Sequence, residues 1–172
     1  MKEVTLRAFT KSDIPRIATL ANDTRISNNL RDYFPSPYKI SDAKVFMDKI
    51  EKQNPKENHA IYWGEELVGN IGIHPFTDLY RFSGEIGYWL GVDYWGNGIM
   101  TKTVPQIIKY GFEVMNLRRI QAGVIRYNQA SARVLEKCGL IFEAELKDKA
   151  YKLGSFHDEL IYAIISNIDP ER

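Results

Sequence analysis

The stretch GEIGYWLGVDYWGNGIMT, residues 84–101, decides the expected fold and contains the first candidate binding site. Its first half is rich in aromatic and β-branched residues, which are typical of a β-strand. Its second half passes through Gly91, Gly96 and Gly98 into a segment where apolar residues recur every three or four positions, as in an amphipathic helix. The sequence therefore predicts a strand, a glycine-containing turn and a helix that begins near Gly98.

A turn of this kind can bind an anion through its backbone. Glycine lets a ligand approach the main chain closely, and the first N–H groups of a helix lack internal partners and lie at the positive end of the helix dipole. We therefore expect a phosphate-bearing ligand over Asn97, Gly98 and Thr101. On spacing alone, a plain connection between strand and helix is the alternative, because glycine turns before helices are common.

The composition is that of a globular chain with balanced charge. A length of 172 residues predicts one domain, residues 1–172. The 23 basic and 22 acidic residues leave no broad positive field, which argues against nucleic acid and anionic membranes as partners. The first residues lack the apolar core of a signal peptide, and one cysteine cannot form an internal disulfide, so we expect a cytoplasmic protein.

The apolar periodicity predicts an α/β (α+β) fold with a mixed sheet and helices on its faces. Strands are expected at 4–7, 59–63, 67–76, 84–92, 119–125, 140–146 and 159–165, and helices at 12–21, 41–50, 98–115 and 128–138. The strand at 119–125 follows a crossover helix, so it should lie parallel to the central strand.

The segment 22–38 is broken by asparagines and two prolines and is expected to be a loop with one helical turn around residues 25–30. A loop of this length is often functional, and Asn29, Tyr33 and Phe34 are candidates to line a substrate entrance. The alternative is a surface loop that packs its own aromatic side chains.

Four stretches together resemble the GNAT acetyltransferase superfamily, and in particular its RimJ/RimL-like branch of ribosomal-protein N-terminal acetyltransferases. In chain order they are ELVGNIGIH at 66–74, the stretch at 84–101, NLRRIQAGVIRYNQASARVLEKCGL at 116–140 and YKLGSFHDELIYAI at 151–164. The resemblance implies a GNAT fold, with a mixed and mostly antiparallel sheet of about seven strands, a V-shaped splay and about four flanking helices.

The resemblance also implies acetyl-CoA as the cosubstrate. The family's pyrophosphate loop, Q/R-x-x-G-x-G/A, falls on residues 95–100, where Trp95 and Met100 depart from the pattern and Met100 is expected to narrow the site. Arg133 is a candidate for the 3′-phosphate, or alternatively an exposed helix residue. The other cofactor-binding residues that the resemblance implies are Trp89, Leu90 and Val92 along the pantetheine arm, Gly96, Asn97, Gly98 and Thr101 in the loop, and Asn128. From the sequence pattern, Asn128 is also expected to be the N-cap of the helix at 128–138, and the two roles are compatible.

The implied reaction is direct attack of a neutral amine on the thioester carbonyl. Glu85 is the carboxylate best placed to accept the amine's proton, directly or through water; its alternative is an ion pair with Arg81 or Arg119. Ser131 matches the branch's serine near the sulfur and is the candidate proton donor to the thiolate; its alternative is a plain first-turn helix residue. Tyr127 and Tyr151 are alternative donors.

The acceptor that the branch implies is a protein N-terminal α-amine, although relatives also act on amino acids, polyamines, amino sugars and antibiotics. Only Asp23 and Asp32 are acidic in the loop at 22–38, which weighs against a polyamine. Two alternatives come from functional classes other than enzymes. One is a non-catalytic module that binds or senses acyl-CoA, and the other is an assembly protein.

Three further expectations concern the rest of the chain. The C-terminal hairpin could support a homodimer. Residues 156–159 are expected to form a turn at its solvated end, or alternatively to reach the substrate. The three histidines fit no metal-binding motif, so no metal is expected.

Overall fold

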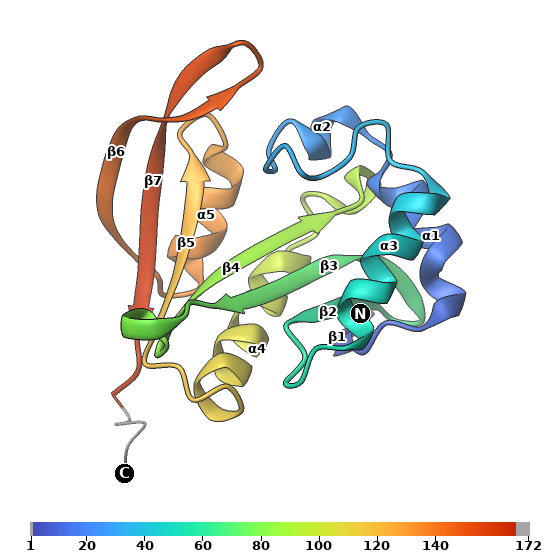
Figure 1. Ribbon diagram of the computed structural model, residues 1–172, viewed down its shortest axis with the longest axis horizontal. Helices are drawn as coiled ribbons and strands as arrows, with labels where there is room; N and C mark the ends of the chain where they lie inside the picture. The colour runs from blue at the N-terminus through green and yellow to red at the C-terminus, as the bar shows by residue number, and fades with distance from the viewer. Residues whose placement is uncertain (1, 168–172) are drawn as a thin grey trace. The chain divides into compact units, whose positions relative to one another are not determined.

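The computed structural model describes residues 2–167 (Figure 1). Seven strands form one mixed sheet in the order β1-β2-β3-β4-β5-β7-β6. The strands are β1 Val4–Arg7, β2 Asn58–Trp63, β3 Glu66–Pro75, β4 Ser83–Leu90, β5 Arg119–Ile125, β6 Ile141–Lys152 and β7 Ser155–Ile165. The helices are α1 Ile14–Ala21, α2 Thr24–Ser27, α3 Ile40–Glu51, α4 Ile99–Glu113 and α5 Gln129–Lys137, with 3₁₀ turns η1 Lys11–Asp13, η2 Asp78–Tyr80 and η3 Val92–Tyr94.

The predicted mixed sheet of seven strands is confirmed, and so is the parallel pairing of the central strand. β4 pairs with β5 in parallel from Ser83↔Arg119 to Glu85↔Gln121. The neighbouring pairs β1–β2, β2–β3, β5–β7 and β6–β7 are antiparallel. The segment at 22–38 contains one short helix, α2, which overlaps the helical turn expected around residues 25–30 and adds to the four longer helices that the sequence predicted.

Two strand boundaries were predicted wrongly. β6 extends to Lys152 and β7 already begins at Ser155, so the hairpin turn is at residues 153–154. Residues 156–159 therefore do not form a turn, because they lie within β7, where Phe156, His157 and Glu159 pair with β6. Phe156, next to the hairpin turn, is 65% exposed, as expected of a solvated hairpin end.

The chain forms two compact units, each built from two segments. The first unit comprises Met1–Gly72 and Tyr88–Thr103, and the second unit comprises Ile73–Gly87 and Val104–Arg172. In the first unit, α1 and α3 pack on the strands through a core of buried side chains that includes Ile17, Ala21, Ala43, Met47, Ala60 and Leu67. This core supports the strand end from which the loop at 91–98 emerges.

In the second unit, the alternation of β5 separates an apolar sheet face from a polar one. Ile120, Ala122 and Val124 are buried. The helices of this unit pack on that face: α5 through the bond from Tyr162 Oη to Glu136 Oε1, 3.0 Å, and α4 through Gly111, where a Cβ would lie 2.7 Å from Ile120 Cδ1. Gln121 and Gly123 alternate with these residues and lie on the opposite face with Glu85.

Candidate active site

The loop after β4 has the backbone that the sequence predicted for an anion site. Residues 95–98 are exposed, and α4 begins directly after them at Ile99. Gly96 and Gly98 have φ angles of 77° and 70°, in the left-handed region that favours glycine. No described atom lies within 4 Å of the position of a Cβ at either residue. The two glycines are therefore required by the backbone conformation and not by tight packing.

Side chains of the loop hold its own main chain. Trp95 Nε1 donates to Leu90 O at 3.0 Å, and Asn97 Nδ2 donates to Tyr94 O and Trp95 O, both at 3.2 Å. Asn97 thus stabilises the turn with its side chain. The groups that remain suited to an anion are backbone amides, because the first amides of α4 have no acceptor within the helix.

Met100 does not stand over the loop. Its side chain is only 8% exposed, and Ile99 beside it is 1% exposed. The larger side chain at this position of the family pattern is therefore accommodated in the protein interior, which argues against the expected narrowing. Thr101, the next residue, lies in the first turn of α4.

The residues expected along the pantetheine arm and at the substrate entrance lie partly together in the first unit. The Phe34 ring is 6.1 Å from the Trp89 ring and 5.0 Å from that of Tyr38. Tyr33 is 78% exposed, and Asn29 Nδ2 donates to Arg25 O at 2.8 Å within its own turn. Only Phe34 of the three entrance candidates is thus packed beside a proposed cofactor residue. Leu90 is buried, and Val92 opens η3.

At the start of α5, the second unit presents the expected asparagine and serine. Asn128 is the N-cap, and its Oδ1 accepts from Ser131 N at 3.2 Å. Ser131 is half-buried in the first turn, and Arg133 is exposed.

Burial raises the pKa of the Cys138 thiol. That shift disfavours a thiolate, which agrees with a packing role for this cysteine.

Glu85 lies half-buried on the polar face of the second unit, beside Gln121. Arg119, one of the ion-pair partners expected for Glu85, donates to both carboxylate oxygens of Glu143, at 2.8 and 2.5 Å. This bond holds the pKa of the Glu143 carboxyl below its usual range. Arg81 lies over the ring of Phe82, with 4.8 Å between its Cζ and the ring centre.

A second carboxylate on this face was not among the predicted site residues. A Cβ on Gly123 would lie only 2.6 Å from Glu159 Oε1, so the Glu159 carboxylate lies directly over the β5 backbone. A side chain at position 123 would displace it. The signal in the sequence was the glycine inside an otherwise regular strand, which often marks a close approach by another group.

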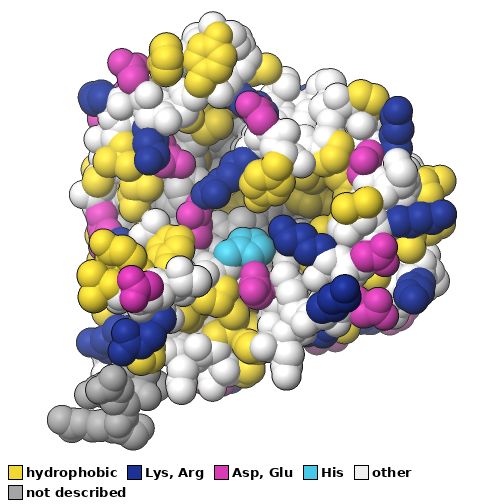
Figure 2. Space-filling model, viewed as in Figure 1, with side chains coloured by type: hydrophobic (Ala, Val, Ile, Leu, Met, Phe, Trp, Pro, Cys, Tyr) yellow, Lys and Arg dark blue, Asp and Glu magenta, His cyan; other side chains and the backbone are white. Residues whose placement is uncertain are grey.

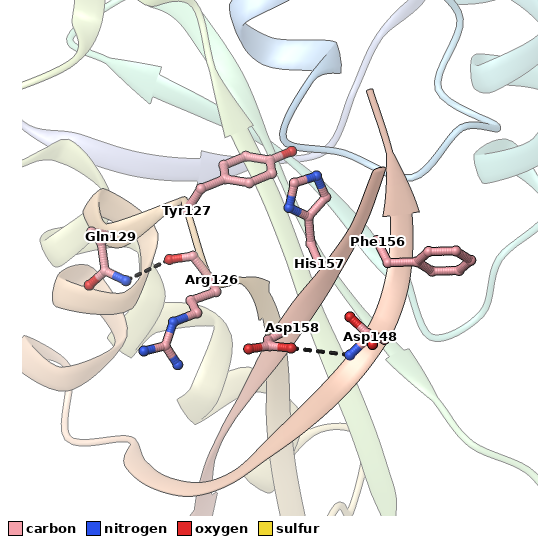
Figure 3. Close-up of a pocket in the computed structure, with 7 residues that line it drawn as sticks. All are labelled: Arg126, Tyr127, Gln129, Asp148, Phe156, His157 and Asp158. Carbon is pink, nitrogen blue, oxygen red and sulfur yellow. Dashed lines mark hydrogen bonds between the residues drawn. The ribbon is translucent and has the colours of Figure 1, made fainter. Parts of the chain in front are cut away.

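A cavity of about 530 Å³ opens beside the start of α5 (Figure 3). The rings of Tyr127 and His157 meet edge to face there, 5.0 Å apart. Asp158 accepts from Asp148 N at 3.1 Å and from Lys147 Nζ at 3.0 Å. The lining residues are Arg126, Tyr127, Gln129, Asp148, Phe156, His157 and Asp158. The cavity therefore offers polar groups of both charges around an aromatic pair.

On the face of the molecule shown in Figure 2, basic and acidic side chains are interspersed. Within residues 2–167, no cluster of three or more His, Cys, Asp or Glu side chains is arranged to hold a metal ion. Over the same residues, no helix has the length and apolar character needed to cross a membrane.

Comparison with known proteins gives consistent matches. The sequence model of a family described as an acetyltransferase (GNAT) domain matches residues 3–141. The chain is 32% identical to the putative ribosomal N-acetyltransferase YdaF of Bacillus subtilis, over 95% of this chain and 92% of that one.

Two solved structures share the fold. RimL, a ribosomal L7/L12 α-N-protein acetyltransferase in complex with coenzyme A, matches with a TM-score of 0.85 and 22% identity over 96% of both chains. The spermidine N-acetyltransferase of Vibrio cholerae in complex with CoA and spermine matches with a TM-score of 0.80 and 22% identity, over 94% of this chain and 95% of that one.

Proposed function

The chain belongs to the GNAT acetyltransferase family, and we propose that it moves the acetyl group of acetyl-CoA to the α-amine of a protein N-terminus. The proposal that acetyl-CoA is the acetyl donor rests on the exposed loop at 95–98, which has two glycines at positive φ directly before a helix. Its backbone fits a pyrophosphate, since amides and the helix dipole favour a negative group there. The acceptor class rests on the likeness to YdaF, which covers nearly the whole chain.

Acetyl-CoA would supply the thioester carbonyl, and the residues of the chain would move the protons. In the proposed reaction, the Glu85 carboxylate accepts a proton from the acceptor ammonium, directly or through one water. The neutral nitrogen forms a bond to the carbonyl carbon, and the bond from that carbon to sulfur breaks. The nitrogen, which is positively charged once it has bonded to carbon, loses its second proton to solvent. The Ser131 hydroxyl gives its proton to the departing thiolate and recovers one from solvent.

The cavity beside α5 is the candidate for part of the acceptor. It is lined by Tyr127 and Gln129, the two neighbours of Asn128, and lies at the helix end that carries Ser131. Its mixture of carboxylates, a histidine and aromatic rings suits the polar backbone of a short peptide. In the first unit, Phe34 remains a proposed substrate contact. Exposed apolar side chains of β6 and β7, such as Ile141 and Phe142, support the proposed homodimer, which molar mass from light scattering tests.

Calorimetric titration with acetyl-CoA, followed by a thiol-release screen over N-terminal peptides and small amines, tests the proposal. Saturable binding with release on peptides supports it. Release only on small amines would support the second candidate, a small-molecule N-acetyltransferase, which the structural likeness to a spermidine acetyltransferase favours. Binding of acetyl-CoA without thiol release on any amine would support a non-catalytic acyl-CoA-binding module. Absence of acetyl-CoA binding would refute the proposal that acetyl-CoA is the donor.

A further inference from the structure

Tyr94 lies at the base of the 95–98 loop and is held there by charged groups from distant parts of the first unit. It is the last residue of η3. Its hydroxyl donates to Glu66 Oε1 of β3 at 2.5 Å and accepts from Arg16 Nη2 of α1 at 2.6 Å. The third side of the triangle is closed by the bond from Arg16 Nη2 to Glu66 Oε1, 2.9 Å. We call these three residues the Tyr94 clamp.

The partners of Tyr94 are themselves fixed. Arg16 Nε donates to the carbonyl of Leu67 at 3.2 Å, which ties the guanidinium to the β3 backbone. Lys2 Nζ lies 3.8 Å from the other carboxylate oxygen of Glu66. The hydrogen bond from Tyr94 lowers the pKa of Glu66, and burial raises the pKa of Tyr94. Near neutral pH, the phenol therefore keeps its proton and the carboxylate its charge.

The other parts of Tyr94 contact the loop and the strand end before it. A Cβ on Gly91 would lie 3.2 Å from Tyr94 Cδ2, so the ring packs against the backbone where β4 ends. The carbonyl of Tyr94 accepts from Asn97 Nδ2 at 3.2 Å. By contrast, no described atom lies within 4 Å of the Cβ positions of Gly96 and Gly98. The conformation of the loop is thus set from its base and not by packing around its tip.

We propose that Tyr94, held by Arg16 and Glu66, is the positioning residue that keeps the 95–98 loop in the conformation that binds the pyrophosphate of acetyl-CoA. The inference rests on the proposed function, since it assigns a task to one part of that donor site. Backbone amides can cradle an anion only when they already point toward it. A loop that must first be ordered pays conformational entropy at the moment of binding, so fixing its base increases affinity.

Tyr94→Phe tests the positioning role of the Tyr94 hydroxyl. The substitution removes only that hydroxyl and keeps the ring that packs against Gly91. Affinity for acetyl-CoA is measured by calorimetry, and rates are measured with acetyl-CoA and with S-acetylpantetheine, a donor without the pyrophosphate. The variant should bind acetyl-CoA about tenfold more weakly, as expected when a hydrogen bond to a charged group is lost. The kcat at saturating acetyl-CoA and the KM for S-acetylpantetheine should stay unchanged.

Tyr62→Phe is the matched control. Tyr62 is another tyrosine of the first unit whose hydroxyl donates to a carboxylate, that of Asp13, at 2.8 Å. Its partner is in η1 and not at the base of the loop, so this variant should bind acetyl-CoA like the wild type. Glu66→Gln provides a second test that leaves Tyr94 intact. This substitution removes the negative charge to which Tyr94 and Arg16 both donate hydrogen bonds, and like Tyr94→Phe it should weaken acetyl-CoA binding.

Three outcomes would overturn the inference. Unchanged acetyl-CoA affinity in both Tyr94→Phe and Glu66→Gln would show that the clamp does not position the loop. An equal loss for acetyl-CoA and S-acetylpantetheine, or an equal loss in Tyr62→Phe, would indicate a general structural defect. Failure of the wild type to bind acetyl-CoA would refute the proposed function itself, and this outcome is distinct because it precedes any comparison of variants.

Discussion

Replacing Gly98 by alanine isolates the energetic cost of the loop conformation. No described atom lies within 4 Å of the Cβ that alanine would add, so steric overlap contributes little. The φ of 70° places that Cβ in the left-handed region, which costs roughly 1–2 kcal/mol for an L-residue. Alanine also reduces the entropy of the unfolded chain, which offsets about 0.4–1 kcal/mol. The net loss of unfolding free energy should be about 0.5–1 kcal/mol.

Gly87→Ala is the matched comparison, because Gly87 lies in β4 in equally open surroundings. Its φ is not among the positive values, so alanine fits the strand backbone without strain. Only the lower entropy of the unfolded chain then changes the stability, so the unfolding free energy of the variant should rise by about 0.4–1 kcal/mol. The same chemical change should therefore have opposite signs at the two positions.

Urea denaturation of both variants, followed by circular dichroism, measures the difference. With a slope of about 2 kcal/mol per M, the two midpoints should be separated by roughly 0.5–1 M. The slopes themselves should agree with that of the wild type. If Gly98→Ala proved as stable as Gly87→Ala, the loop would not be held at positive φ in solution, and the argument for a pyrophosphate site at its backbone would fail.

Three further variants test other parts of the molecule. Glu85→Gln should lower the turnover rate about 100-fold, as expected when a general base is lost, while calorimetry finds acetyl-CoA affinity unchanged; a wild-type rate would remove Glu85 from the mechanism. Burial lowers the pKa of His59 below its ordinary value of 6.5. The unfolded state thus binds more protons, so the unfolding free energy should fall as the pH drops below about 6.5, and His59→Gln should flatten this dependence in denaturant titrations at several pH values. Gly69→Ala places a Cβ 2.3 Å from the carbonyl oxygen of Trp89, and it should cost about 1–3 kcal/mol in the urea assay; a neutral effect would contradict this close approach.

The elements that local pattern defines were predictable from the sequence. The alternation of Ile120, Ala122 and Val124 predicted a strand with one buried face, and all three are buried in β5. Asn128 was expected to cap the next helix, and its side chain does so through the amide of Ser131. In both cases the deciding interactions lie within a few residues along the chain.

The second half of β6 could not be predicted in the same way. Residues 147–152 read KDKAYK, a charged run without apolar alternation, and β6 is the last strand of the sheet order. Edge strands commonly carry charged side chains, especially lysine, which discourage pairing with another chain. The pairing with β7 is also irregular between Leu146 and Ala150. The strand is therefore defined by its partner and not by its own pattern.

The contacts that shape the candidate site were missed for a related reason. The Tyr94 clamp joins residues 28 and 78 positions apart, and Glu159 of β7 reaches Gly123 on the neighbouring strand β5. Sequence spacing predicts neighbours on one helix or strand, but these pairs depend on the register between strands. The glycines of the loop were found because their constraint is local.

The exposed indole of Trp95 gives the donor site an optical reporter. The chain has three tryptophans, Trp63, Trp89 and Trp95, and all three belong to the first unit. Trp95 is 47% exposed within the loop, whereas the other two are half-buried. Intrinsic tryptophan fluorescence of the unlabelled protein should therefore respond chiefly to events at this loop, with the emission of Trp95 shifting to shorter wavelength when a ligand covers it. Conformational change confined to the second unit should leave that spectrum unchanged.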